Sequence, residues 1–262
     1  MPHGEAFVRA FHAAHPGATT AAFARGGSYA RLAAEVPTGA RVLDLACGDG
    51  YLLELLGARG VAAIGVDVAA EEVRAATARG GRAVQGRAQA LPFASAAFDA
   101  VTCHLALMLM ADLDVVSGEL ARVLVPGGAL RAVVGGGPVA RVDPASPACV
   151  YARWLALLQP RFASAPPLRL GDPRASREAG WRALLEPRGF AAIGFTRIEL
   201  DLGGTFDEVW ATLSTSYDAA RLGAADLREP LRAAIADLVA PDGHVPLRAV
   251  AWLASATRTR LA

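Results

Sequence analysis

Residues 41 to 135 alternate short apolar runs with longer amphipathic ones, and this rhythm constrains the fold more than any other feature of the chain. The short runs predict five strands, at 41–46, 61–66, 82–86, 98–104 and 128–135. The longer runs predict three helices, at 50–59, 69–79 and 112–125. Strands that alternate with helices form βαβ units, whose strands lie parallel in one sheet. We therefore expect an α/β fold.

The alternation of strand and helix patterns is less regular on either side of this core. The first 40 residues predict helices that cap the sheet, and "VPGG" at 125–128 predicts a helix end followed by a turn. After residue 135, two Gly/Pro-rich stretches flank a short helical pattern, "YARWLALLQ", which we interpret as an insertion over the active site. The remainder predicts a helix, a strand, a helical region and a last strand, at 176–188, 190–201, 206–239 and 246–256.

These patterns predict one domain over residues 1–262. Its expected parts are a helical cap at 1–40, a cofactor-binding core at 41–135, and acceptor-side insertions with the last two strands at 136–262. A chain of this length with 53% hydrophobic residues can bury a large core.

Charge and hydropathy exclude several classes of function. The chain has 26 basic and 25 acidic residues, and no segment gathers arginine into a stripe, so a nucleic-acid partner is not expected. The longest apolar run, at 105–111, is too short to span a bilayer, and the first residues carry charges where a signal peptide is apolar. We expect a cytoplasmic protein without membrane insertion.

Cysteine and arginine usage add two expectations. The three cysteines are widely separated and form no C-x-x-C pair, so neither a disulfide framework nor a metal site is predicted. Lysine and asparagine are absent while arginine is abundant. We interpret this composition as the mark of a GC-rich, bacterial genome.

The first strand ends in an acidic glycine turn, "LDLACGDG". In an open α/β sheet, ligands lie outside the carboxyl ends of the strands, and glycines at that corner let a ligand approach the backbone. Asp44 and Asp49 line the turn, and Asp67 ends the second strand, 17 residues after Gly50. A carboxylate at that distance suits two ribose hydroxyls. The acids favour a ligand with cationic groups over a pyrophosphate.

A dinucleotide-dependent oxidoreductase is the alternative for such a corner. Its fingerprint requires a third glycine three residues after the second, and Leu53 stands there instead. The acids of the turn would also repel a pyrophosphate. An NAD-dependent enzyme is therefore the less favoured interpretation.

Several motifs occur in order along this part of the chain: "VLDLACGDGYL", "GVDVAAEEV", "GRAQALPFASAAFDAVTCHLALMLM" and "ELARVLVPGGAL". Together they resemble the class I S-adenosylmethionine-dependent methyltransferases, nearest the ubiquinone and menaquinone C-methyltransferase branch. The resemblance implies a Rossmann-like three-layer sandwich with a mostly parallel seven-stranded sheet of order 3-2-1-4-5-7-6, its last strand antiparallel. It also implies S-adenosylmethionine as cofactor and methyl transfer by direct displacement.

The resemblance assigns cofactor roles by position. Asp44, Ala46 and Gly48 would surround the methionine part, and Asp67 would bind the ribose. The adenine would lie beside three further residues, Val68, Ala88 and Gln89. Tyr29 and Arg25 are candidates for the cofactor's carboxylate.

One position departs from the branch. The chain reads "GRAQALPF" where the branch reads Gly-Asp-Ala-Glu-Ala-Leu-Pro-Phe, so Arg87 replaces an acid that accepts a hydrogen bond from the adenine amino group. A guanidinium has no acceptor. Either Gln89 or a backbone carbonyl takes over that role, or Arg87 stacks or points to solvent.

Methyl transfer requires alignment and exclusion of water more than a fixed catalytic group. Where a base helps, His104 is the candidate, because it ends the fourth strand at the cofactor's side of the sheet. His12 and His15 would reach the acceptor if the first helices fold over the site. Tyr151 and Trp154 are candidates to wall an acceptor pocket, as are Phe162, Trp210 and Tyr217.

Two aromatic-bearing insertions and little net charge favour a small, fairly apolar acceptor. A non-methylating protein that uses the same pocket for binding or for another reaction stays open, because function depends on the site and not on the fold. The identity of the acceptor and the oligomeric state are not determined by these patterns.

Overall fold

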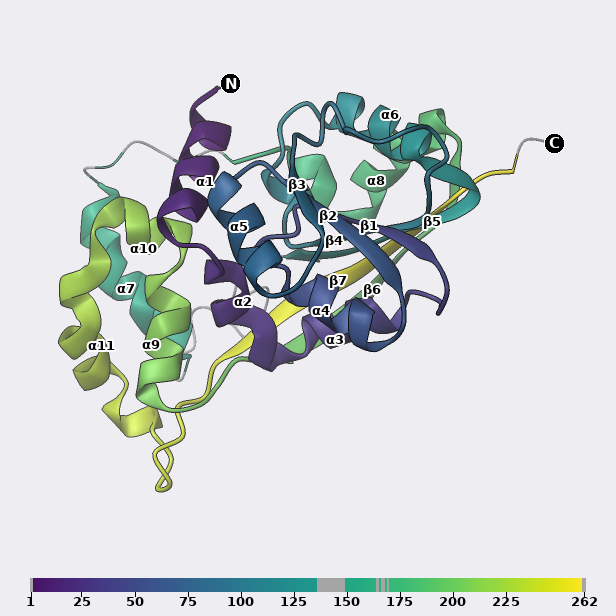
Figure 1. Cartoon of the computed structure of the whole chain (residues 1–262). Coiled ribbons are helices and arrows are strands. Elements are labelled where there is room, and N and C mark those ends of the chain that lie inside the picture. The colour runs from purple at the N-terminus through teal and green to yellow at the C-terminus, as the bar shows by residue number, and fades with distance from the viewer. Residues whose placement is uncertain (1, 136–148, 164, 166–167, 169, 261–262) are drawn as a thin grey trace.

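A single seven-stranded sheet organises the computed structural model, which describes residues 2–135, 149–163, 165, 168 and 170–260 (Figure 1). The strand order is β3-β2-β1-β4-β5-β7-β6, which confirms the predicted order. β7 runs antiparallel to β5 and β6, whereas the neighbouring strands from β3 to β5 pair in parallel. The strands are β1 Arg41–Leu45, β2 Ala62–Asp67, β3 Ala83–Gln85, β4 Phe98–His104, β5 Leu124–Gly135, β6 Phe190–Asp201 and β7 Arg248–Arg258.

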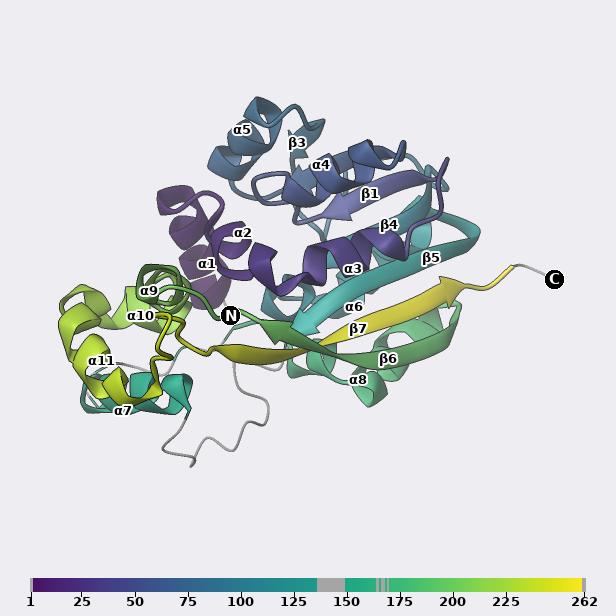
Figure 2. The ribbon, with the colours of Figure 1, turned by 90° about the horizontal axis from the view of Figure 1, so that it is seen from below.

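Helices cover both faces of this sheet (Figure 2). The helices of the described residues are α1 Pro2–Ala14, α2 Ala18–Phe23, α3 Ser28–Ala34, α4 Tyr51–Ala58, α5 Ala70–Ala78, α6 Leu113–Val123, α7 Val150–Phe162, α8 Glu178–Leu185, α9 Phe206–Ser214, α10 Tyr217–Leu222 and α11 Arg228–Ala234. One core contains buried residues of α3 and α4, and the other contains those of α6 and α8.

Successive residues of the central strands face opposite cores. In β5, Val133 packs with α3 and α4, while Val134 packs with α6 and α8. Both are fully buried. A parallel sheet with helices on each face requires apolar residues on both sides, which explains why these strands read as continuous apolar runs.

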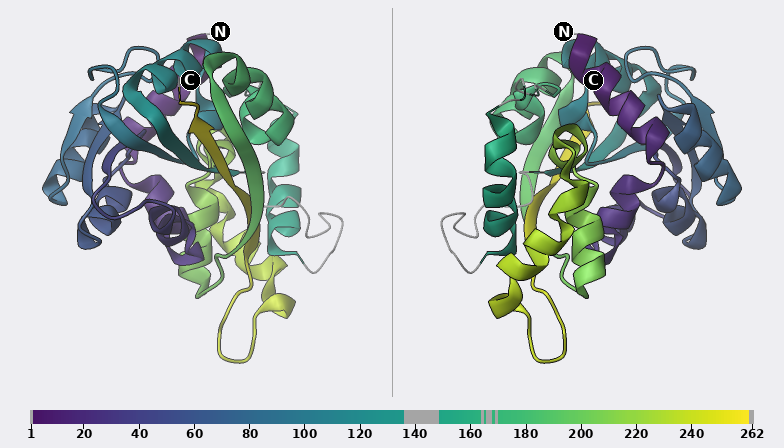
Figure 3. Two further views of the ribbon diagram at one scale, coloured as in Figure 1. Left: turned by 90° about the vertical axis from the view of Figure 1, so that its right-hand side faces the viewer. Right: turned by 90° about the vertical axis from the view of Figure 1, so that its left-hand side faces the viewer.

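A second group of helices lies beyond the carboxyl ends of the parallel strands. It consists of α7, α9, α10 and α11, and it lies next to α1 (Figures 1, 2 and 3). The predicted helical region 206–239 is thus confirmed and divides into three helices joined by short turns. This group and the first two helices place side chains over the same end of the sheet.

The turn predicted at 125–128 lies inside a strand. β5 begins at Leu124, which is buried and pairs with Phe98, and the register then shifts before Ala100 pairs with Ala129. An irregularity of this kind accommodates extra residues in one strand. Here residues 125–128 of β5 lie opposite Asp99 of β4, and Gly127 among them has φ of 85°. The strand therefore starts four residues earlier than predicted.

Candidate cofactor pocket

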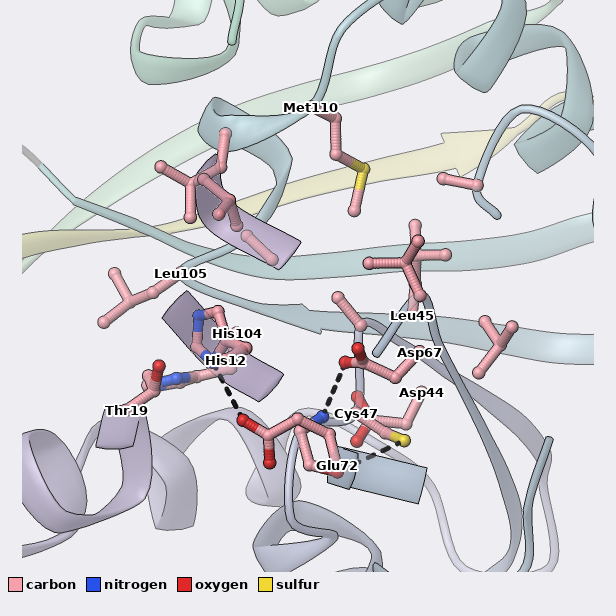
Figure 4. A pocket seen from close by; sticks show the side chains of 18 of the residues that line it. His12, Thr19, Asp44, Leu45, Cys47, Asp67, Glu72, His104, Leu105 and Met110 are labelled. Carbon is pink, nitrogen blue, oxygen red and sulfur yellow. Dashed lines mark hydrogen bonds and ion pairs between the residues drawn. The ribbon is translucent and has the colours of Figure 1, made fainter. Parts of the chain in front are cut away.

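The main cavity of the described residues lies at the carboxyl ends of β1, β2 and β4, beneath α1 and α2 (Figure 4). We call it the cofactor pocket. Its polar part includes four carboxylates and two histidines, namely Asp44, Asp49, Asp67, Glu72, His12 and His104. Its apolar part includes Val8, Leu105, Ala106, Leu109 and Met110. The pocket thus joins an acidic region to an apolar one.

The acidic region is organised around Gly48. The Gly48 backbone N–H donates to Asp67 at 3.0 Å, and the Ala69 N–H donates to the other carboxylate oxygen at 2.9 Å. Gly48 has φ of 53°, and a Cβ placed on it would have no heavy atom nearer than Glu72 Oε2, at 3.9 Å. The backbone here therefore borders open space that a ligand can enter, as the glycine turn predicts.

Burial perturbs the carboxyl groups of this region. Asp44 is 2% exposed, and the Thr102 hydroxyl donates to it at 3.0 Å. Desolvation raises the pKa of Asp44 to about 7, and it also raises the pKa of Asp67. A cation beside these groups would reverse the effect, because it favours their charged forms.

Gly50 has a different role from Gly48. Its φ is 80°, and a Cβ on it would lie 2.9 Å from the Cα and Cβ of Ala76 in α5. Gly50 therefore allows α4 and α5 to approach, while Gly48 faces the cavity. Ala46 and Leu105 also have positive φ, at 58° and 54°, although neither is glycine. Both line the pocket, and such strained backbone is often found at functional sites.

His104 lies at the wall of the pocket and is held from two sides. Its Nε2 lies 2.8 Å from the Ser28 hydroxyl, and its ring stacks on Tyr29 with centroids 3.6 Å apart. Its Nδ1 has no hydrogen-bond partner among the described residues. Burial lowers the pKa of His104 to about 3, so the imidazole is neutral near pH 7. This environment makes it a weaker base than an ordinary histidine, and its catalytic role stays a prediction.

His12 contacts two residues that are distant in the sequence. His12 Nδ1 lies 2.8 Å from Glu72 Oε1, and Nε2 lies 2.9 Å from the Tyr217 hydroxyl. The Gly17 N–H donates to the second oxygen of Glu72 at 3.0 Å. These contacts join α1, α5 and α10 over the cavity. Sequence reasoning missed Glu72, because an acid in the first turn of a helix ordinarily faces solvent.

Five of the other predicted cofactor residues line the pocket, namely Ala46, Val68, Ala88, Gln89 and Tyr29. The Gln89 side-chain nitrogen donates to the Ala111 carbonyl at 3.0 Å. Arg87 also lines the pocket and pairs with Glu5 of α1, with nitrogen and oxygen 2.8 Å apart.

Arg25 is not among the residues that line the pocket, and its contact with the cofactor stays a prediction. Its guanidinium donates to the carbonyls of Leu202 and Glu208 and to the hydroxyl of Thr212. In this arrangement Arg25 ties the first helices to α9.

Three predicted acceptor residues also lie outside the pocket lining. His15 is exposed, and its ring is tilted against that of Phe11 with centroids 5.1 Å apart. Tyr151 packs on the core, and burial raises its pKa to about 12. Trp154 is 1% exposed and meets Trp210 edge-to-face with ring centroids 5.8 Å apart. The aromatic pattern of α7 therefore belongs to the core of the helical group, because these rings pack between helices and not toward the cavity.

The described residues contain no cluster of three or more histidine, cysteine or acidic side chains that could hold a metal ion. Within the same ranges, no helix has both the length and the apolar character needed to cross a membrane.

Comparison with known proteins agrees with this geometry. Residues 43–132 match a family model described as a methyltransferase domain. This part of the chain is similar to methyltransferase domains. A demethylmenaquinone methyltransferase from Thermus thermophilus is 44% identical over 98 residues, which are 34% of this chain and 44% of that protein. The chain spans about half the length of the curated relatives it matches.

Solved structures with a similar fold cover more of the chain. A SAM-dependent methyltransferase from Methanosarcina mazei has a TM-score of 0.52 at 17% identity, covering 86% of this chain and 95% of that one. The [4+2]-cyclase SpnF has a TM-score of 0.55 at 18% identity, covering 89% and 80%. Since one neighbour is named a cyclase, the fold alone does not determine the reaction.

Proposed function

We propose that this chain binds S-adenosylmethionine in the cofactor pocket and transfers its methyl group to a small, fairly apolar acceptor. The observation that carries the proposal is the pair of buried carboxylates, Asp44 and Asp67, beside the open side of Gly48. Buried carboxylates are costly unless they are paired or neutralised. A ligand with a sulfonium and an ammonium group provides the missing positive charge.

The same groups argue against the alternative dinucleotide. A pyrophosphate at the turn would lie among Asp44, Asp49 and Asp67 and would be repelled. The residues fit the nucleoside sulfonium instead. Asp67 accepts one backbone N–H on each oxygen, and each oxygen keeps capacity for a ribose hydroxyl.

When bound, the cofactor would supply its methyl group: the acceptor atom would bond to the methyl carbon as the carbon–sulfur bond breaks, and S-adenosylhomocysteine would be the leaving group. The chain's residues orient the two partners and exclude water. Val8, Leu105, Leu109 and Met110 form the apolar wall suited to this second task. His104 remains the proposed base, although its buried, neutral ring suits an acceptor that is already acidic.

The curated relatives support the choice of a small acceptor. Two of them are named demethylmenaquinone methyltransferase and 2-phytyl-1,4-naphtoquinone methyltransferase. We extend to this chain only the chemical class of the acceptor, which is a small apolar molecule. We also propose a cytoplasmic, bacterial enzyme without a nucleic-acid partner, supported by its near-zero net charge and its free cysteines.

Calorimetric titration with S-adenosylhomocysteine tests the proposal. We expect wild-type binding and no binding of NAD, and we expect Asp67→Ala to weaken affinity by more than about tenfold, since hydrogen bonds to a charged acceptor contribute about 1.5 to 3 kcal/mol each. Glu71→Ala is the matched control, because Glu71 pairs with Arg74 outside the pocket. An unchanged dissociation constant for Asp67→Ala would contradict the ribose assignment.

Turnover distinguishes a methyltransferase from a non-methylating protein. The protein is incubated with S-adenosylmethionine and a panel of small phenols, hydroquinones and amines, and released S-adenosylhomocysteine is measured. Tight cofactor binding without turnover across the panel would favour the non-methylating alternative.

A further inference from the structure

An ion pair closes the end of the cofactor pocket beyond Asp67. Glu5 comes from α1, Arg87 follows β3, and both line the cavity. One guanidinium nitrogen, Nη2, lies 2.8 Å from Glu5 Oε1 and 3.0 Å from Oε2. A single nitrogen of Arg87 thus meets both oxygens of Glu5. The Arg87 Nε and Nη1 groups make no hydrogen bond to the residues that the structure describes. Glu5 therefore keeps free lone pairs, and Arg87 keeps free N–H donors.

The position of this pair relative to Asp67 is set by the sheet. β3 pairs with β2 so that Gln85 lies opposite Asp67, and the Gly86 N–H donates to the Asp67 carbonyl at 2.9 Å. The residues after β3 therefore lie next to the carboxyl end of β2. The resemblance to methyltransferases implies that a nucleoside whose ribose is held by Asp67 would extend its base past Val68 toward this segment.

The chemistry of the pair matches the edge of adenine. Adenine presents an amino donor next to ring-nitrogen acceptors. A carboxylate only accepts hydrogen bonds and a guanidinium only donates them. Glu5 can thus accept from the 6-amino group while Arg87 donates to a ring nitrogen. A 6-oxopurine would place a carbonyl oxygen against the Glu5 carboxylate. Both groups are hydrogen-bond acceptors and would repel each other.

Two backbone acceptors near this segment already accept one hydrogen bond each. The Val68 carbonyl accepts from the Gln85 side chain at 3.1 Å, and the Arg87 carbonyl accepts from the Ala90 N–H at 3.1 Å. Gln89 is oriented by its bond to the Ala111 carbonyl. Glu5 lines the pocket beside them and is a charged acceptor, which makes a stronger hydrogen bond than a carbonyl.

We propose that Glu5 determines specificity for the adenine base by binding its 6-amino group, and that Arg87 positions the Glu5 carboxylate. This inference rests on the proposed function, because it requires S-adenosylmethionine in the pocket. It assigns to α1 a direct role in choosing the cofactor.

The test compares S-adenosylhomocysteine with S-inosylhomocysteine, in which a 6-oxo group replaces the 6-amino group. By calorimetry, we expect wild type to prefer the adenine compound by roughly tenfold to a hundredfold, the range for a hydrogen bond to a charged group. Glu5→Gln should reduce this preference to less than about threefold, because an amide can both accept and donate. Glu71→Gln, outside the pocket, should retain the wild-type preference.

The ratio of affinities separates this role from a structural one. If the ion pair only docks α1, Glu5→Gln weakens both compounds equally and the ratio is unchanged, which would overturn the inference. It would also be overturned if Gln89→Leu removed the preference while Glu5→Gln kept it. A wild-type protein that does not bind S-adenosylhomocysteine would overturn the proposed function as well, so the two failures are distinguishable.

Discussion

At the scale of single residues, two buried groups of the pocket link stability to pH in opposite directions. The pKa of Asp44 is raised to about 7 by burial, so its stabilising contribution is present at acidic pH and is lost as the pH rises through 7. The pKa of His104 is lowered to about 3 by burial, so its contribution is present above 6.5 and is lost as the pH falls toward 3. Between about pH 4 and 6.5 the two effects oppose each other.

Single substitutions should separate these contributions. Relative to wild type, we expect Asp44→Asn to gain stability as the pH rises from 5 to 8, with a slope of at most about 1.4 kcal/mol per pH unit. His104→Gln should instead gain relative stability as the pH falls from 6.5 to 4.5. Urea unfolding at several pH values measures both. If the free energy of unfolding of variant and wild type changed in parallel with pH, these pKa assignments would be contradicted.

At the scale of elements, α1 acts as the cover of the pocket. Glu5, Val8, Arg9 and His12 line the cavity, and their spacing places them on one face of the helix. The helix is attached through Glu5 to the segment after β3, and through His12 to α5 and α10. Phe11 is buried and also meets the Tyr217 ring edge-on, with centroids 4.8 Å apart. We expect α1, which lies outside the sheet, to open more easily than the central strands.

Removal of the His12 contacts should release this helix locally. We expect His12→Ala to increase amide hydrogen exchange over residues 2–14, because Glu72 loses one of its two partners and the Tyr217 hydroxyl loses its hydrogen bond to His12. Exchange in β1 and β4 should not change. His15→Ala is the matched control, since His15 is exposed on the same segment and lies outside the pocket lining. Equal exchange in His12→Ala and wild type would show that α1 is held by other contacts.

At the scale of the whole molecule, the helical group of α7, α9, α10 and α11 shares one core with the α3 and α4 face of the sheet. Trp154 lies in this core with Leu158 and Val209, all of them fully buried. The group therefore contributes to the stability of the protein. Within the described residues, it contacts the cofactor pocket through Tyr217.

This arrangement predicts a stability effect at Trp154. We expect Trp154→Ala to lower the free energy of unfolding by about 3 to 5 kcal/mol, the range for removing a large buried aromatic side chain. Tyr151→Phe, a change on the same helix at a half-buried site, should have little effect. Urea denaturation measures both. A Trp154→Ala protein of normal stability that binds acceptor poorly would restore Trp154 to the acceptor site.

Local patterns were sufficient to predict the strands and several residues of the cofactor pocket, whereas the strand order was implied by the resemblance to methyltransferases. Strand and helix periods depend on neighbouring residues, and the carboxyl ends of parallel strands meet at one edge, so Asp44, Gly48 and Asp67 could be grouped without coordinates. The same rule placed His104 at the pocket wall. It could not predict that burial would keep this ring neutral, because burial depends on Tyr29 and Ser28, more than 70 residues away in the chain.

By itself, the sequence determined the α/β order, the acidic glycine turn and the chemistry expected there. Only the tertiary structure decided which of the candidate side chains reach the cavity: it brought Glu72 and Glu5 to the pocket, and it placed Arg25, His15, Tyr151 and Trp154 elsewhere. The physical reason is the range of the interactions. Periodicity and turn chemistry act over a few residues, whereas the helix that covers the pocket is positioned by partners 60 to 205 residues away.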